Sequence, residues 1–182
     1  MPGSIHPALL SLFSALAYGA LFGLNQWLFG AFSFSEGVAW VFLPSGLRLL
    51  LVVVCAGAGA VGIAIASSVI SVLWFFQEDP LTGVVAGLIS GLAPWLARRI
   101  SFALLGVRED LAGLRAGALL RMAALFALVS ATLHQVWYVA RGHSPDFVQG
   151  TLVMSVGDFL GALIVLYVAR LALMAFSRLA RC

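Results

Sequence analysis

Charged residues are scarce in this chain of 182 residues, and lysine is absent. Only 9% of the residues are charged, ten arginines against seven acids, whereas 63% are apolar and the mean hydropathy is +1.10. A soluble domain is about a quarter charged, so the composition excludes a soluble enzyme, a nucleic-acid-binding domain and a disordered chain. It indicates an integral membrane protein made mostly of spanning helices, with the lipid bilayer as its main partner.

Cysteine and the usual catalytic patterns are also lacking. The two cysteines, Cys55 in an apolar run and Cys182 at the end of the chain, do not indicate a disulfide framework. No cluster has zinc-ligand spacing, and no acid–base or nucleophile pair stands at a usable spacing. Residues 57–62 match GxGxxG, but the uniformly apolar sequence around them favours a tight turn over a nucleotide site. We therefore expect no metal, no cofactor and no enzymatic activity.

The apolar residues divide into six segments, which predict an all-α, six-helix transmembrane bundle forming one domain. No basic residue precedes the first segment, so we expect a retained span rather than a cleaved signal peptide. The second and third segments are short, and a Gly-rich turn near 56–60 joins them; one tilted span is the alternative. The predicted spans cover residues 8–30, 44–57, 60–76, 81–105, 117–140 and 147–170.

Arginine is distributed unevenly between the two sides of this bundle. One cluster surrounds the segment between the fourth and fifth spans, and another follows the sixth; two spans separate them, so they lie on the same side. Basic residues mark the cytoplasmic side of a membrane protein, so both termini are predicted to be cytoplasmic. The clusters comprise Arg98, Arg99, Arg108, Arg115 and Arg121, and then Arg170, Arg178 and Arg181.

Small residues recur at the spacing that brings helices together in lipid. Gly19 and Gly23 form one GxxxG pair, and Gly157 and Gly161 form another. The predicted fourth span carries the same spacing twice, in Gly83, Gly87 and Gly91. Because glycine at this spacing lets backbones approach closely, we expect these residues to pack spans of this chain together, with dimerisation as the alternative.

Two charges inside the predicted spans do not belong to the arginine clusters at the predicted cytoplasmic side. Arg48 lies near the start of the second span and Asp158 lies deep in the sixth. A charge within the membrane is costly and faces the bundle interior or a cavity, usually with a partner. We therefore predict an Arg48–Asp158 ion pair, which either belongs to a functional site or only locks the two helices.

Other polar residues occur at a similar depth and would extend this site. Asn25 and Gln26 lie in the outer third of the first span, and His134 and Gln135 lie near the outer end of the fifth. Together with the predicted ion pair, they predict a polar pocket open to the outside. His134 alone is more typical of a hydrogen-bonded buried residue or of an interface residue.

Two short stretches resemble the type-one membrane-associated sensor (MASE) domain family. Residues 40–46, Trp-Val-Phe-Leu-Pro-Ser-Gly with Pro44, Ser45 and Gly46, are similar to the W-x-P-P-S-G element of that family. Residues 156–163, which contain Gly157, Asp158 and Gly161, resemble its G-D-x-x-G-x-L element, and residues 81–100 resemble its central span with a basic end.

The resemblance implies a sensory input domain of the bacterial inner membrane, which in that family precedes a histidine kinase, a diguanylate cyclase or a phosphodiesterase. This chain is shorter than the usual eight-span domain and carries no output domain, so the expected signal passes to a separate membrane or cytoplasmic partner. The expected function is thus a ligand-binding sensory module for an unidentified small ligand, with no nucleic-acid partner. The alternatives are a substrate-binding component similar to the S-component of an energy-coupling factor transporter, and a structural subunit of a membrane complex.

Overall fold

Apolar segments separated by short polar turns give a structure that is almost entirely helical. The computed structural model describes residues 6–104 and 116–179. The predicted loop arginines Arg108 and Arg115, and the terminal Arg181 and Cys182, lie outside these ranges. The described helices are α1 (Pro7–Phe29), α2 (Leu43–Ile70), α3 (Pro80–Leu104), α4 (Ala116–Ala140) and α5 (Phe147–Leu179), with a 3-10 turn η1 (Gly30–Phe32) and a π-helical turn η2 (Ser71–Phe75).

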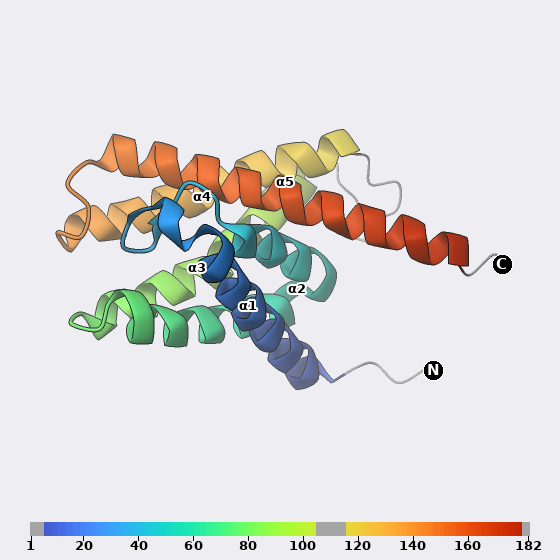
Figure 1. Cartoon of the computed structure of the whole chain (residues 1–182), viewed down its shortest axis with the longest axis horizontal. Coiled ribbons are helices and arrows are strands. Elements are labelled where there is room, and N and C mark those ends of the chain that lie inside the picture. Colours follow the sequence, from blue (N-terminus) through green and yellow to red (C-terminus); the bar gives the residue numbers. More distant parts are fainter. Residues whose placement is uncertain (1–5, 105–115, 180–182) are drawn as a thin grey trace.

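Five helical segments of the described chain are long enough and apolar enough to cross a membrane. Their burial pattern is typical of such a protein, because large apolar side chains such as Leu16, Val54 and Leu88 point outward while polar ones are buried. In Figure 1 the turns that follow η2 and α4 lie at one end of the bundle, and the start of α1 and the end of α5 lie toward the other. Helix α5 extends beyond its neighbours at that second end.

Helix α2 is broken at Ala56, within the predicted Gly-rich turn. Ala56 has φ 49° and ψ −128°, outside the helical region, and divides α2 into two arms. Gly59 packs directly against the Leu51 carbonyl group, although the two residues would be about 12 Å apart along an unbroken helix. Phe42 and Phe75, at the two ends of the α2–η2 segment, line the same pocket. The chain therefore reverses direction at Ala56, and its second arm continues through η2.

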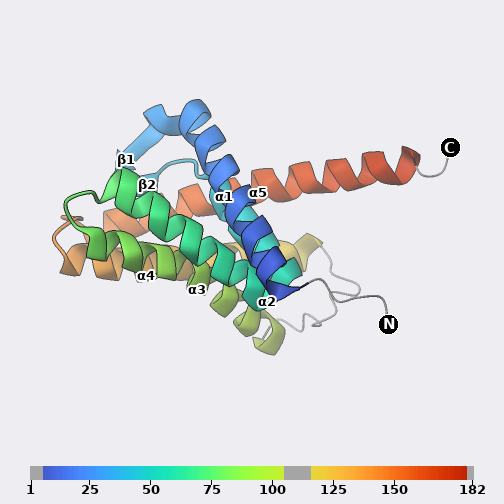
Figure 2. The ribbon, with the colours of Figure 1, turned by 90° about the horizontal axis from the view of Figure 1, so that it is seen from below.

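A small hairpin lies in the segment between the first two predicted spans. Strands β1 (Ser33–Ser35) and β2 (Val38–Ala39) pair antiparallel, joined by Glu36 and Gly37. Gly37 has φ +71°, a conformation that glycine adopts without steric cost. Figure 2 shows the hairpin beside the C-terminal end of α1, away from the start of the chain. The bundle is therefore not purely helical, since two residues with turn propensity are enough to close a hairpin between short strands.

Most of the predicted glycine contacts are present. Gly83, Gly87 and Gly91 of α3 pack on the second arm of α2, against Val72, Ser68 and the Ala60–Ala64 turn. Gly157 and Gly161 of α5 pack on the backbone that leads into the first arm, at Ala39 and Phe42.

Gly19 and Gly23 behave differently from the other glycines. Within the described chain neither has a neighbour within 4 Å of the position where a Cβ would stand. The prediction that they pack spans of this chain together is therefore wrong. Helix α1 contacts α2 through another face, which carries Ser14, Tyr18 and Phe22.

Candidate functional site

The predicted ion pair between the two intramembrane charges is present. Arg48, in the first arm of α2, donates from Nη2 to Oδ1 of Asp158 on α5 at 2.8 Å. Each side chain is only 1% exposed. Such burial requires that the two charges compensate one another, because an unpaired charge in an apolar interior is strongly unfavourable.

The guanidinium of Arg48 is enclosed by α3, α4 and the start of α2. Its Nη1 atom donates to Ser90 Oγ of α3 at 3.2 Å. The rings of Phe42 and Phe126 lie 5.4 and 5.3 Å from Cζ, a distance at which an aromatic face attracts a cation. The remaining guanidinium nitrogen, Nε, is buried and has no hydrogen-bond partner among the described residues.

His134 of α4 continues this polar network. Its Nδ1 atom lies 2.8 Å from the Ser130 carbonyl oxygen, which favours a proton on Nδ1. Its Nε2 atom lies 3.4 Å from Ser90 Oγ and 3.2 Å from the Ala86 carbonyl oxygen. The Ser130 hydroxyl lies beside the Asp158 carboxylate without the geometry of a full hydrogen bond. The network thus connects four helices through Asp158, Arg48, Ser90 and His134.

The two stretches that carry the family resemblance pack against each other and position the ion pair. Ser45 Oγ lies 2.6 Å from the Asp158 carbonyl oxygen and 2.8 Å from that of Phe42. The Phe42 amide donates to the Gly157 carbonyl at 3.3 Å. Gly46 lies against Gly161. These backbone contacts fix the start of α2 against the middle of α5, and so place Arg48 opposite Asp158.

Asn25 has a structural role instead of lining a pocket. Its Oδ1 atom accepts a hydrogen bond from the Leu43 amide at 2.9 Å, and the side chain is buried. The first amides of a helix have no partner within the helix and need an external acceptor. Asn25 supplies one for α2, and Pro44, near the start of the same helix, needs none.

Gln135 lies apart from the ion pair. It is 0% exposed and packs against Gly150 of α5, and within the part of the chain that the structure describes neither of its amide atoms has a hydrogen-bond partner. Arg48, Asp158, His134, Gln135 and Asn25 are all buried, so they do not line the open pocket predicted from their depth. The hairpin and the start of α2 pack on α5 above them and seal that end of the bundle.

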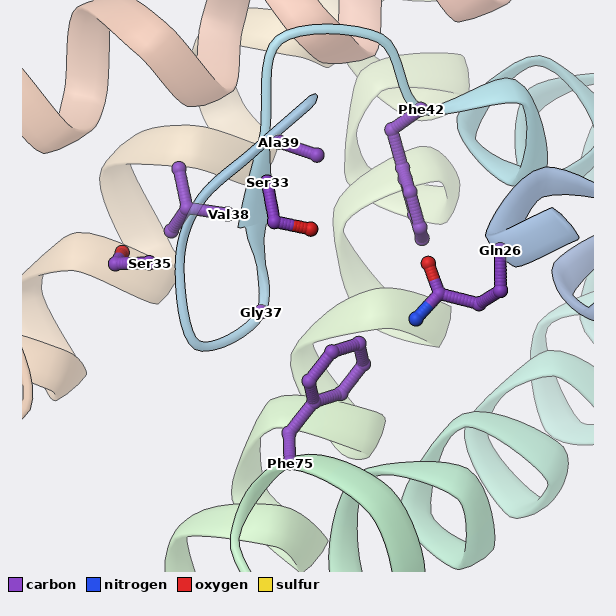
Figure 3. Close-up of a pocket in the computed structure, with 8 residues that line it drawn as sticks. All are labelled: Gln26, Ser33, Ser35, Gly37, Val38, Ala39, Phe42 and Phe75. Atoms are coloured by element: carbon purple, nitrogen blue, oxygen red, sulfur yellow. The ribbon is translucent and has the colours of Figure 1, made fainter. Parts of the chain in front are cut away.

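A small pocket lies between the hairpin and the ends of α1 and η2, and Gln26 is the predicted site residue that lines it. Figure 3 shows Gln26 facing the hairpin across a gap that Phe42 and Phe75 border. The cavity volume is only about 10 Å³, room for about one water molecule, far below the roughly 300–1,000 Å³ of most ligand sites. Phe42 borders this pocket and also contacts Arg48. The lining residues are Gln26, Ser33, Ser35, Gly37, Val38, Ala39, Phe42 and Phe75.

A second polar cluster, which the sequence did not indicate, joins the outer turns. Asp79 Oδ2 accepts hydrogen bonds from the Thr82 hydroxyl at 2.6 Å and from Arg141 at 3.0 Å. His143 Nε2 lies 3.1 Å from the same oxygen, and His143 Nδ1 lies 3.6 Å from Glu36 Oε2. The hydrogen bond from Thr82, followed by that from His143, holds the pKa of Asp79 far below its usual range. These residues come from turns far apart in the sequence, so spacing alone could not bring them together.

Among the described residues, no group of three or more His, Cys, Asp or Glu side chains is arranged to hold a metal ion. Comparison of the chain with protein-family models, with characterised proteins and with solved structures finds no significant match.

Proposed function

We propose that the protein is a membrane-embedded ligand-binding module of the sensory type, which passes its signal to a separate protein. The observation that carries this proposal is the buried Arg48–Asp158 pair placed directly beneath an outer pocket. Ionisable residues within a membrane protein are rare and costly, and they commonly mark ligand, ion or proton pathways. The resemblance of the two stretches that hold the pair to MASE domains supports the same role.

Phe42 connects the pocket with the ion pair. Its ring borders the pocket and lies 5.4 Å from the Arg48 guanidinium, while its amide donates to α5. A small polar ligand held by Gln26 and the hairpin serines would press on this ring and change the environment of Arg48. A ligand that binds one arrangement of the pair better than another shifts the population between them.

Helix α5 is the proposed output element. It runs from the outer turn past Asp158 to Leu179 without a break, over a length of about 50 Å. A displacement at Asp158 would therefore reach the far end of the helix, where Arg170 and Arg178 lie. A membrane or cytoplasmic partner that docks there would receive the signal.

The proposed orientation follows from the reversal at Ala56. If each arm of α2 counts as one span, six spans cross the bacterial inner membrane, and both termini are cytoplasmic with the hairpin outside. We expect reporter fusions at residue 1 and at residue 182 to give cytoplasmic signals, and a fusion in the turn at Gly142 to give a periplasmic one. A periplasmic N-terminus would contradict the six-span arrangement and leave five spans.

A substitution at Gln26 tests whether the pocket binds a ligand. Small molecules that co-purify with the protein in nanodiscs are identified by native mass spectrometry, for the unmodified chain and for Gln26→Leu. One hydrogen bond contributes about 0.5–1.5 kcal/mol, so we expect occupancy at limiting ligand to fall about two- to tenfold. Gln149→Leu, at an exposed position on the outer end of α5, is the matched control and keeps full occupancy. Equal occupancy in both variants, or no bound molecule in the unmodified protein, contradicts the proposal.

A transport component is the second candidate, and one observation favours it. Gly19 and Gly23 present an open small-residue face on α1, the type of surface on which a partner helix packs closely in lipid. A substrate-binding S-component would dock on its coupling subunit in this way. Neighbouring ATPase and coupling-subunit genes would favour transport, and a neighbouring kinase or cyclase gene would favour sensing. A stoichiometric partner that binds without any ligand effect would favour the third candidate, a structural subunit.

A further inference from the structure

Three outer segments of the chain, two turns and the hairpin, meet at the imidazole ring of His143. His143 belongs to the turn between α4 and α5, and its Nε2 atom lies 3.1 Å from Asp79 in the turn before α3. Its Nδ1 atom lies 3.6 Å from Glu36 at the tip of the hairpin. The ring also stands edge-on against Phe76, with centroids 5.0 Å apart. His143 therefore lies between two carboxylates that belong to different segments.

This arrangement suits a charged imidazole better than a neutral one. A neutral ring carries a single N–H and presents a lone pair from its other nitrogen, whereas an imidazolium donates from both. With carboxylates facing both nitrogens, loss of the proton leaves one lone pair directed at an anion. Asp79 remains held by Arg141 and Thr82 in either state, so the contact with Glu36 is the one that weakens.

Other ionisable groups near the ring do not reverse this preference. Arg141, in the same turn, hydrogen-bonds Asp79 Oδ2. Tyr138 of α4 packs on Phe76 beneath the ring, and its hydroxyl lies against Gly37 of the hairpin. Among the residues in the described ranges, the charged groups that face His143 are therefore two carboxylates and one arginine that already binds one of them.

We propose that His143 is a pH-controlled latch that fastens the β1–β2 hairpin over the outer pocket. The protonated ring binds Glu36 and Asp79 together and holds the hairpin down. The neutral ring releases Glu36 and frees the hairpin, whose five strand residues include four that line the pocket. The contacts of His143 with Glu36 and Asp79 support the latch by themselves. Only its consequence for ligand access rests on the proposed function.

The direction of the pH effect follows from linkage. A contact that only the protonated ring makes stabilises the closed hairpin at low pH, so raising the pH from about 5 to about 8 favours opening. Glu36 is 61% exposed, and exposed ion pairs contribute little. The closed population is therefore expected to change about two- to fivefold across this range.

Hydrogen exchange of the hairpin amides measures the latch without any ligand. A two-stranded hairpin is marginally stable by itself in water, so its amides exchange once the latch opens. After correction for intrinsic rates, we expect protection of residues 32–40 in nanodiscs to be about two- to fivefold higher near pH 5 than near pH 8. His143→Gln should abolish the difference, whereas His6→Gln, at the exposed start of α1, should keep it.

Glu36→Gln provides the second test, because this exposed side chain can be changed with little effect on folding. It removes the carboxylate of the hairpin while His143, Asp79 and Arg141 stay in place, and it should also remove the pH dependence. The latch is overturned if the pH dependence persists in either His143→Gln or Glu36→Gln. It is also overturned if the unmodified protein shows no pH dependence. Failure of the Gln26→Leu experiment alone would overturn the ligand pocket and leave the latch intact.

Discussion

Replacement of Asp158 by asparagine is expected to destabilise the protein by about 3–5 kcal/mol. The substitution leaves the Arg48 guanidinium buried, 1% exposed, without a compensating negative charge. The Ser90 hydroxyl accepts only one hydrogen bond from the Arg48 guanidinium. The Phe42 and Phe126 rings offer it weak cation–π contacts. Removal of one partner of a buried pair costs more than removal of both, because the remaining charge stays in an apolar interior.

A double-mutant cycle measures this coupling. The free energies of unfolding of Asp158→Asn, Arg48→Met and the double variant are determined by denaturant titration in mixed micelles. The double variant should lose less stability than the sum of the single variants, since no unpaired charge remains in it. Glu78→Gln, which neutralises an exposed acid in an outer turn, is the control and should change stability by less than about 0.5 kcal/mol. Additive losses in the cycle would show that the two charges do not depend on each other.

The second large effect is expected at Gly161, where an added methyl group should destabilise the protein by about 1–3 kcal/mol or more. In Gly161→Ala the new Cβ would overlap the carbonyl group of Phe42, and the Ser45 hydroxyl also lies within 3 Å. The obstacle is backbone at the start of α2, not the end of a flexible side chain, so the helices must separate. Because these contacts place Arg48 opposite Asp158, the ion pair should loosen together with the packing.

Gly19→Ala is the matched control for this substitution. It makes the same change in the interior of a transmembrane helix, but no described atom lies within 4 Å of the new methyl group. Alanine is favoured over glycine in helices by about 1 kcal/mol, so this variant should be as stable as the native protein or slightly more so. Equal losses of stability in Gly161→Ala and Gly19→Ala would contradict the packing described for α5.

The sequence predicted the elements that depend on local composition. With the two arms of α2 counted separately, each described helix begins within a few residues of a predicted span, although α5 continues past residue 170 to Leu179. A run of about 20 apolar residues has few alternatives to a helix in lipid. The break at Ala56 falls where alternating glycine and alanine interrupt an overlong apolar run. The ion pair was predictable because a membrane protein holds few charges, and each requires a partner.

The contacts that the sequence did not predict join segments that are far apart along the chain, so they depend on the tertiary fold. Asn25 was expected in a pocket, yet it binds the first amide of α2, because the hairpin brings that helix end alongside α1. Gly19 and Gly161 have the same kind of spacing motif, but only Gly161 faces another segment of the chain. The His143 cluster joins residues 36, 79 and 143, and no local pattern connects turns so far apart.

The reversal at Ala56 also has a consequence for the surrounding lipid. At about 1.5 Å per residue, the first arm of α2 is about 20 Å long, whereas a bilayer core is about 30 Å thick. The turn would thus lie within the hydrocarbon layer, where backbone polar groups need partners. The Ser11 hydroxyl of α1 supplies one, since it donates to the Ala58 carbonyl at 2.9 Å. On this side of the bundle, hydrophobic mismatch would thin the adjacent leaflet, so the stability of the fold should depend on the acyl-chain length of the lipid that contains it.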